Sequence, residues 1–429
     1  MKIGLLHHTG GGNLGDEGTQ EAVIQGIKSR WPRASFVGLT MNPDDTRARH
    51  GIPSYPLRRE TWTMGYRPDA APVTPREDAK RRLGKYPRAF ALLRIVYTLA
   101  IRIPKTIGQE LIFLIRSRRI VRSLDLLIVN GGGQLTEWGG PWEFTYTVFK
   151  WVSLARLSGV RCYFLNIGAG PLTGRLAKFF ARRALFSAEY VSFRDEESCT
   201  LARQIGYTGP AHVYPDSVYS LNVTSHDSTG PRPGRPPIVA VSPMPYCDPR
   251  IFAEKNQSVY DAYIRTLGRF TAHLLRHGCA VALLSSDIGV DPMAVEDLQR
   301  ALKNEGISAV SHPLSAERVA STQDLLARMS AVDFVVTSRF HGVVCAHLVN
   351  KPVVALSHHP KVAALMNDLG LAGYCVRDLR SFDVEGLTAT FQALVDDQDQ
   401  IRSRMAERLA VYRGRLAGQF DELFPMETS

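Results

Sequence analysis

Short apolar, β-branched runs alternate with amphipathic stretches along most of this 429-residue chain. Buried parallel strands read as continuous apolar runs, whereas helices place apolar residues three and four apart, so the pattern predicts strands separated by helices. The strands predicted in the first half are Lys2–Leu6, Ser35–Leu39, Leu126–Val129, Cys162–Asn166 and Tyr190–Phe193. Those predicted in the second half are Ile238–Ser242, Ala280–Leu284, Phe334–Val336 and Pro352–Leu356. Helices are predicted at Thr19–Ser29, Leu176–Ala188, Val259–His277 and Asp324–Met329.

A stretch rich in Pro and Gly separates the two sets of strands. After His226 the chain reads DSTGPRPGRPP, a composition typical of linkers between domains. We therefore expect an N-terminal α/β domain over residues 1–225, a linker at 226–237 and a C-terminal α/β domain over 238–429. In such a pair, ligands bind beyond the carboxyl ends of the strands, in the cleft between the domains. Functional residues are therefore expected directly after the predicted strands.

One segment carries the whole basic excess of the chain. Between Arg58 and Arg122 there are 16 Lys and Arg against 5 Asp and Glu, a surplus equal to the formal charge of +11 of the entire chain. This insertion at about 58–122 interleaves arginines with apolar runs. Two interpretations fit residues 88–122: a helix that lies on an anionic membrane surface, or an amphipathic helix that packs on the core with a solvated basic face. Nucleic-acid binding is not expected, because no recognition motif accompanies the charge.

The composition otherwise matches an ordinary globular protein, with 45% hydrophobic and 22% charged residues. Six cysteines lie far apart without a CxxC pair, which argues against a disulfide framework or a zinc site. No apolar run approaches the length of a spanning helix, and the first residues turn polar too soon for a signal peptide. We expect a cytoplasmic protein, held peripherally on the inner face of the plasma membrane if the first interpretation of the basic segment holds.

The first candidate site follows the first predicted strand. Gly10-Gly11-Gly12-Asn13-Leu14-Gly15-Asp16-Glu17 satisfies a GxGxxG pattern. A dinucleotide fold would also need an acidic residue at the end of the second strand, which instead ends Thr40-Met41-Asn42. Because carboxylates repel phosphate, Asp16 and Glu17 suit hydroxyl binding or acid–base work better than a phosphate cradle. The alternative is that Asp16 merely caps the helix.

Two further motifs end strands in the N-terminal half. The triplet Gly131-Gly132-Gly133 follows a buried strand, where its backbone N–H groups either meet a ligand or simply form a tight turn. Arg194 follows another strand and either grips an anion in the cleft or pairs with a neighbouring carboxylate, while Asp195 is predicted to cap the next helix. Asp216 ends a further strand and has no assignable role from the sequence.

The most specific motif lies in the C-terminal half. Ser338-Arg339-Phe340-His341-Gly342 directly follows one strand and leads into a helix predicted at Val343–Val349. His358-His359-Pro360-Lys361 follows the next strand. Two adjacent strand ends would bring Arg339, His341 and Lys361 into one crevice, a cationic cluster suited to phosphate and carboxylate. The two neighbouring histidines, without a third spaced ligand, are poor evidence for zinc.

Taken together, these motifs resemble the polysaccharide pyruvyl transferase family. The resemblance covers roughly residues 1–50 and 120–375 and rests, in the family's order, on Asn13–Glu17, Gly131–Gly133, Ser192–Asp195, Pro215–Asp216, Ser338–Gly342, Lys351–Val353 and Pro360–Lys361. It implies two Rossmann-like α/β domains with a cleft between them, arranged as in GT-B glycosyltransferases. It also implies transfer of the enolpyruvyl group of phosphoenolpyruvate onto sugar hydroxyls as a pyruvate ketal, in exopolysaccharide or cell-envelope polysaccharide biosynthesis.

The resemblance assigns the donor to the C-terminal side of the cleft. The residues that would bind phosphoenolpyruvate are Arg194, Arg339, Lys361, Ser338 and Gly342. Since imidazole titrates near neutral pH, His341 would handle the proton or stabilise the phosphate. Phosphoenolpyruvate enters as a substrate, and neither a cofactor nor a metal is expected.

The acceptor would lie on the N-terminal side. There Asp16 or Glu17 would orient or deprotonate an acceptor hydroxyl, and the residues around the acceptor would be Gly12, Asn13, Gly15, Gly131, Gly132 and Gly133. The acceptor is expected to be a saccharide, lipid-linked and made at the cytoplasmic face of the membrane.

Two other functions stay open. A GT-B glycosyltransferase that uses a nucleotide sugar would need a carboxylate in the C-terminal half to hold a ribose, and Asp368 offers one. A non-catalytic anion- or saccharide-binding protein would use the same cations without turnover.

Overall fold

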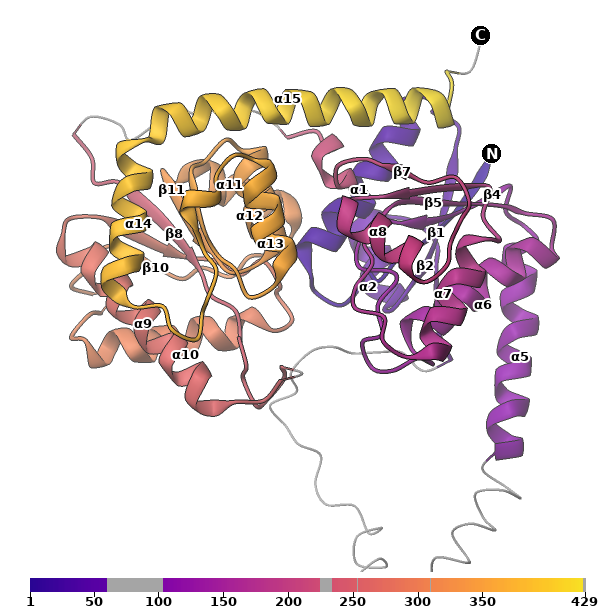
Figure 1. The fold of residues 1–429 in the computed structure, drawn as a ribbon, viewed down its shortest axis with the longest axis horizontal. Coiled ribbons are helices and arrows are strands. Elements are labelled where there is room, and N and C mark those ends of the chain that lie inside the picture. Colours follow the sequence, from indigo (N-terminus) through magenta and orange to yellow (C-terminus); the bar gives the residue numbers. More distant parts are fainter. Residues whose placement is uncertain (60–102, 224–233, 253, 309, 427–429) are drawn as a thin grey trace, which may run out of the picture.

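The computed structural model describes residues 1–59, 103–223, 234–252, 254–308 and 310–426. Two parallel sheets, each with helices on both faces, form the two halves of the molecule (Figure 1). Most of the predicted basic insertion, residues 60–102, lies outside the described residues. So does the greater part of the predicted linker, up to residue 233.

The N-terminal sheet has seven parallel strands in the order β3-β2-β1-β4-β5-β6-β7. They are β1 (Lys2–Leu6), β2 (Ser35–Thr40), β3 (Ser54–Pro56), β4 (Leu126–Asn130), β5 (Arg161–Ile167), β6 (Tyr190–Phe193) and β7 (His212–Val213). The five predicted strands are confirmed, while the edge strands β3 and β7 are too short to show an apolar run. Since Leu6 pairs with Val129, the residues that follow lie side by side: His7, just after β1, and Asn130, the last residue of β4.

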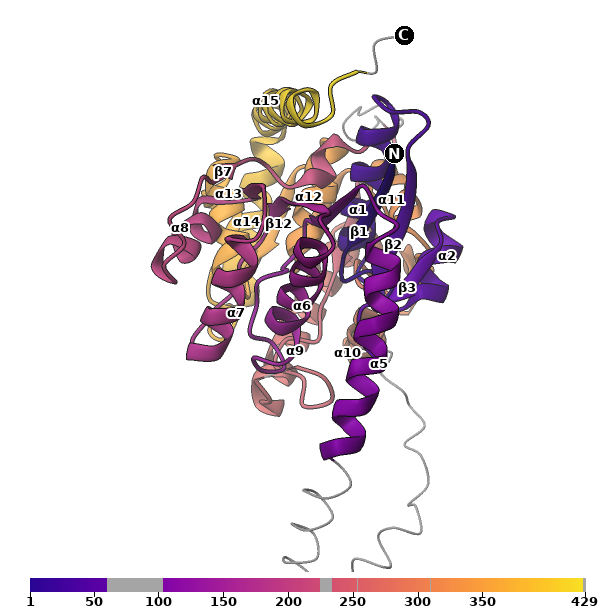
Figure 2. The ribbon, with the colours of Figure 1, turned by 90° about the vertical axis from the view of Figure 1, so that its right-hand side faces the viewer.

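Helices cover both faces of this sheet. They are α1 (Leu14–Lys28), α2 (Pro43–His50), α5 (Ile103–Val121), α6 (Phe144–Leu157), α7 (Arg175–Leu185) and α8 (Glu196–Gln204), with a 3₁₀ turn, η2, at Ser217–Ser220. Helix α1 packs Val23 and Ile27 against one face. Helices α5 to α8 pack on the other, where Trp151 and Ala181 meet the buried residues of β4 and β5. Figure 2 shows α5, α6 and α7 side by side.

The C-terminal sheet has six parallel strands in the order β10-β9-β8-β11-β12-β13. They are β8 (Ile238–Ser242), β9 (Ala280–Leu283), β10 (Leu314–Ser315), β11 (Phe334–Thr337), β12 (Val353–Leu356) and β13 (Cys375–Val376). Its helices are α9 (Gln257–Arg276), α10 (Asp291–Asn304), α11 (Thr322–Ala331), α12 (Phe340–Leu348), α13 (Pro360–Asp368) and α14 (Val384–Asp396), with a 3₁₀ turn, η3, at Ala372–Tyr374. Strands β11 and β12 are neighbours, as predicted, so the two motifs that follow them leave the sheet together.

The last helix, α15 (Gln398–Leu423), joins the two halves (Figure 1). Its first turns bury Ile401 and Met405 in the C-terminal core, whereas Phe420, near its end, packs in the core of the N-terminal sheet. The amide of Gln419 exchanges two hydrogen bonds, of 2.8 and 2.9 Å, with that of Asn166 after the middle of β5. The predicted division at 226–237 assigns this helix wholly to the C-terminal half, but its final turns stabilise the N-terminal half.

Candidate active site

The glycine-rich loop after β1 docks onto the loop after β9 in the other half. The N–H of Ile288 donates to Gly12 O at 2.8 Å, and the N–H of Leu14 donates to Ser286 O at 3.0 Å. A Cβ on Gly12 would lie 2.7 Å from the backbone nitrogen of Gly289, so only glycine allows this approach. In this structure Gly12 therefore forms part of the contact between the halves.

Asn13 caps helix α1, since its Oδ1 accepts a hydrogen bond from Gly15 N at 3.1 Å. The alternative in which Asp16 caps this helix is therefore wrong. Asp195 is confirmed as the cap of α8, where its Oδ1 accepts from Ser198 N.

His341 lies in the first turn of α12 and packs on the first turn of α1. A Cβ on Gly15 would overlap the imidazole ring of His341, so glycine at this position lets the two helix starts meet across the cleft. Gly342 serves the same turn, because a Cβ there would overlap the side chain of Thr337 at the end of β11. The structure thus brings the glycine-rich motif after β1 into contact with the Ser338–Gly342 motif after β11.

Asp216, just before η2, holds two of the predicted residues. Its Oδ2 accepts a hydrogen bond of 3.0 Å from Arg194 Nη1 and lies 3.8 Å from His341 Nε2. Its Oδ1 accepts from Thr19 Oγ1 at 3.3 Å and from Val218 N at 3.1 Å. Burial alone would raise the pKa of Asp216, but His341 and Arg194 hold it well below its usual range. A buried carboxylate therefore orients both the imidazole and the guanidinium.

Lys361 lies beside Arg194. Its Nζ donates to Ala169 O at 2.6 Å, and a Cβ on the adjacent Gly168 would lie 2.8 Å from Arg194 Nε. That Nε is buried and has no hydrogen-bond partner among the described residues. Burial, and then the charge of Arg194, lower the pKa of Lys361 to about 8. Both side chains line a cavity of about 310 Å³ between the halves, together with Asp216 and Phe340.

Asp16 lies on the other side of this network, against the glycine triplet. A Cβ on Gly132 would lie 3.1 Å from Asp16 Oδ1 and 3.2 Å from His7 Nε2, and the φ of Gly132 is +59°. Gly131 packs closely on Thr19, while Gly133 has open space around it. Burial raises the pKa of Asp16 to about 6, although His341 and Arg194 oppose this rise. Asp16 therefore changes charge near neutral pH.

His7 is a site residue that sequence reasoning missed. Its imidazole is fully buried and neither ring nitrogen has a hydrogen-bond partner in the described part of the chain. Burial lowers its pKa to about 3, so the ring is neutral at physiological pH. Its position directly after β1 was the signal available in the sequence.

Three of the predicted site residues have polar partners within the protein. Glu17 accepts a hydrogen bond from Gly10 N at 2.7 Å and lies 2.7 Å from His50 Nε2. Ser338 Oγ lies 2.7 Å from the hydroxyl of Tyr263. The guanidinium of Arg339 donates to Asp291 Oδ1 at 2.6 and 3.1 Å and lies 3.7 Å from Asp287. The guanidinium of Arg339 therefore already has two carboxylate partners before any ligand binds.

Buried polar atoms without a partner gather where strands of both sheets end. Among the described residues they include atoms of His7, Asn130, Arg194, Ser242, Ser286 and His341. An unsatisfied buried donor or acceptor costs roughly 1–3 kcal/mol, so such atoms cluster where water or a ligand supplies the missing partner. This edge of the molecule is therefore built to meet a polar ligand.

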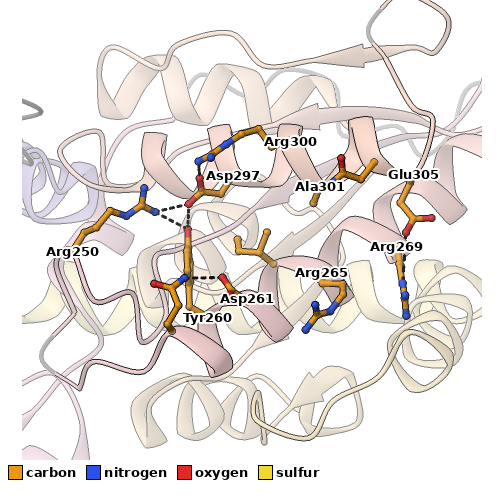
Figure 3. Close-up of a pocket in the computed structure, with 12 residues that line it drawn as sticks. Arg250, Tyr260, Asp261, Arg265, Arg269, Asp297, Arg300, Ala301 and Glu305 are labelled. Atoms are coloured by element: carbon orange, nitrogen blue, oxygen red, sulfur yellow. Dashed lines mark hydrogen bonds and ion pairs between the residues drawn. The ribbon is translucent and has the colours of Figure 1, made fainter.

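A larger cavity of about 500 Å³ lies between α9 and α10 (Figure 3). Three of the arginines that line it already have acidic partners: Arg250 pairs with Asp248 and Asp297, Arg269 lies 3.5 Å from Glu305, and Arg300 pairs with Asp297. None of the predicted site residues lines it. The smaller cavity between the halves is therefore the better candidate, despite its size.

Asp368, which a nucleotide-sugar enzyme would need for a ribose, lines the cavity between the halves. Its carboxylate accepts hydrogen bonds from Arg408 and from the hydroxyl of Tyr412. A ribose would have to compete with both.

Comparison with solved structures shows the same fold in other proteins. Staphylococcus aureus MnaA in a co-structure with UDP matches with a TM-score of 0.53 and 11% identity over 100% of this chain and 98% of that one. A UDP-GlcNAc 2-epimerase from Methanocaldococcus jannaschii matches with a TM-score of 0.53 and 10% identity over 91% and 92%. The N-terminal domain of Candida albicans trehalose-6-phosphate phosphatase matches with a TM-score of 0.53 and 12% identity over 98% of both. The fold is GT-B-like, with two Rossmann-like domains.

Comparison by sequence is more specific. No curated protein matches this chain significantly. The family model of the polysaccharide pyruvyl transferases, however, matches residues 13–360, which include Asp16, Arg194 and His341. The resemblance seen in the strand-end motifs is thereby confirmed, and this protein belongs to the polysaccharide pyruvyl transferase family.

Proposed function

We propose that this protein transfers the enolpyruvyl group of phosphoenolpyruvate onto two hydroxyls of a saccharide, forming a pyruvate ketal and releasing phosphate. The observation that carries the proposal is that three kinds of chemical group lie together at the cleft between the halves. Arg194 and Lys361 supply adjacent cations, His341 is paired with the buried Asp216, and Asp16 offers a carboxyl that titrates near pH 6.

The donor is a small molecule with a carboxylate and a phosphate, and it needs several N–H donors. Lys361 gives a single hydrogen bond, to a neutral carbonyl. The buried Nε–H of Arg194 makes no hydrogen bond within the described residues, although it lies 3.6 Å from Asp195 Oδ2. Both can therefore donate to an anion without giving up their present partners. Arg339 would reach the donor only by leaving Asp291, and in our scheme it holds the turn, with Ser338 and Gly342, that presents His341.

The reaction needs one proton delivered and two removed. His341, whose Nε2 lies 3.8 Å from Asp216 Oδ2, protonates the methylene carbon, which makes the adjacent carbon oxocarbenium-like. A first sugar hydroxyl attacks that carbon and gives its proton to Asp16. Phosphate leaves with its bonding electrons, and a second hydroxyl closes the ring, its proton passing to His341. The donor's methylene thus becomes the ketal methyl group, and His341 regains the proton that it delivered. Asp16 returns to its starting state when the proton that it accepted leaves with the phosphate, as hydrogen phosphate.

We further propose that the acceptor is a lipid-linked saccharide at the cytoplasmic face of the membrane, in polysaccharide biosynthesis. His7 lies with Asp16 against Gly132, and Asn130 lies beside His7. The neutral polar atoms of His7 and Asn130 suit sugar hydroxyls rather than an anion.

Thermal protection tests the choice of donor. Phosphoenolpyruvate at about 100 times its Kd should stabilise the wild-type protein by about 2.7 kcal/mol, visible as a higher Tm. Lys361→Met should lose most of this protection because it keeps the aliphatic stem but not the charge. Lys303→Met, a control on α10, removes the same charge away from the cleft. Phosphoenolpyruvate should raise the Tm of this variant as much as it raises that of the wild type. Protection by UDP-N-acetylglucosamine but not by phosphoenolpyruvate would instead support a nucleotide-sugar glycosyltransferase.

The pH profile of kcat/KM should be bell-shaped. Asp16, with its pKa raised to about 6, accepts a proton only above that pH, so the rate should rise through about pH 6. Lys361, with its pKa lowered to about 8, is a cation only below that pH, so the rate should fall above it. Lys361→Arg keeps the charge at high pH and should move only the alkaline limb upward. An alkaline limb unchanged in this variant would remove Lys361 from donor binding.

A further inference from the structure

Helix α5 presents an unusual outward face. Ile107, Leu111, Ile112 and Ile115 are each between 53% and 56% exposed, although large aliphatic side chains normally pack inward. The inward side of the helix is formed by Phe113, whose ring meets Trp151 of α6, and by the buried Ser117 and Val121. One side of the helix thus packs on the core, as the second interpretation of this segment expects, but four aliphatic side chains remain outside that packing.

Arginines occupy the same outward face further along the helix. Arg116, Arg118, Arg119 and Arg122 are exposed, and no acidic residue lies between Leu111 and Arg122. The nearest acidic residue, Glu110, accepts a hydrogen bond of 3.1 Å from Lys150 of α6. On the outward face of α5 the exposed side chains are thus aliphatic in the first turns and cationic in the last turns. From Leu111 to Arg122 every charged residue is positive.

The starts of the neighbouring helices extend this surface. Helices α5, α6 and α7 precede the parallel strands β4, β5 and β6, so all three run antiparallel to the strands. The aliphatic first turns of α5 therefore lie at the same edge of the sheet as the starts of α6 and α7 (Figure 2). There Trp142 is 58% exposed and Phe179 is 44% exposed. The ring of Trp142 contacts that of Phe180, which also contacts that of Phe179, so one aromatic cluster joins the starts of α6 and α7.

A groove of about 440 Å³ lies between α5 and the edge strand β3. Ile112, Phe113 and Ile120 form its apolar wall, and Arg59 and Arg116 also line it. Aliphatic side chains with cations beside them are the pattern of a bilayer interface, where apolar residues enter the acyl region and arginines meet headgroup phosphates. Exposed tryptophan is also typical of that interface.

We infer that this surface, formed by the outward face of α5 and the starts of α6 and α7, docks on an anionic lipid bilayer. No helix in the described part of the chain is long and apolar enough to cross a membrane, so the contact is with the surface of the bilayer. The carboxyl edge of the N-terminal sheet, which carries Asp16, faces the same way as the starts of these helices. Docking would therefore bring the acceptor side of the cleft near a lipid-linked saccharide. The inference does not depend on the chemistry proposed above.

Flotation of the full-length protein with vesicles tests this docking, using vesicles that contain neither donor nor saccharide. The wild type should float with phosphatidylglycerol-containing vesicles and not with pure phosphatidylcholine. Arg116→Ser/Arg118→Ser/Arg119→Ser should lower the partition coefficient more than about tenfold, since each arginine near an anionic surface contributes appreciably. Arg265→Ser/Arg269→Ser/Arg276→Ser on α9 removes the same charge and should bind as the wild type does.

The aliphatic contribution is tested separately. Ile107→Ser/Leu111→Ser/Ile112→Ser/Ile115→Ser should lose the binding that persists at high salt, where the attraction of the arginines is screened. Because these side chains are exposed, an unchanged Tm would show that the variant folds. Equal flotation of the α5 and α9 variants would overturn the inference. So would a wild type that stays unbound and forms a dimer which the aliphatic variant abolishes, since a second copy would then cover this face.

Discussion

His341→Asn should lower kcat for pyruvyl transfer by about 10²–10⁴-fold, the usual contribution of a general acid or base. In our scheme the imidazole delivers the proton, and the buried carboxylate of Asp216 lies 3.8 Å from its Nε2. Asparagine can occupy the same space but cannot deliver a proton. Phosphoenolpyruvate should still protect the variant against heat, because Arg194 and Lys361 remain, so the loss should appear in kcat rather than in donor binding.

His347 offers a matched control on the same helix. It is fully buried, with its Nε2 2.8 Å from Met405 O and its Nδ1 3.1 Å from the hydroxyl of Tyr219, and it does not reach the cleft. His347→Asn should lower the Tm and leave kcat within a few-fold of the wild type. If His341→Asn kept a kcat within a few-fold of the wild type, His341 could not be the proton donor.

Gly15→Ala should reduce activity by more than about tenfold without unfolding the protein. Alanine is favoured over glycine within helices by about 1 kcal/mol, so helix α1 itself should tolerate the change. The added methyl group, however, would overlap the ring of His341, which must move or open the cleft. A displacement of about 1 Å at a catalytic group can cost on the order of 10²-fold in rate. Steady-state kinetics and a thermal melt on the same sample separate the two effects.

Gly414→Ala provides the control for this substitution. Gly414 lies within α15 and a Cβ there would meet nothing within 4 Å. This variant should be slightly more stable than the wild type and equally active. An active Gly15→Ala variant would mean that the contact between α1 and His341 is absent from the working enzyme.

The positions of most strands and the meeting of the two motifs after β11 and β12 could be predicted from the sequence. Fully buried runs such as Leu126–Asn130 are readable because both faces of a parallel strand are covered. The neighbouring ends of β11 and β12 follow from the alternation of strands and helices, and this places Ser338–Gly342 beside Pro360–Lys361.

The pairing of charges could not be predicted, because it depends on segments far apart in the chain. Arg339 was expected to grip an anion, yet its partner Asp291 begins the helix after β9. Glu17 was a candidate base, yet His50 at the end of α2 lies against it. Asp216 had no assignable role until the fold brought Arg194 and His341 to it. A residue type and its position at a strand end indicate a site, but the fold decides which groups remain available to a ligand.

Transfer of labelled carbon most directly tests the central claim that the cleft forms a pyruvate ketal from phosphoenolpyruvate. ¹³C-labelled phosphoenolpyruvate would be incubated with lipid-linked saccharide and wild-type protein, and the acceptor examined by mass spectrometry and NMR. We expect the acceptor to gain the mass of pyruvic acid minus water, with a labelled ketal carbon and methyl group, and one phosphate released per transfer. Labelled pyruvate free in solution, with an unmodified acceptor from an active preparation that phosphoenolpyruvate protects, would contradict the account.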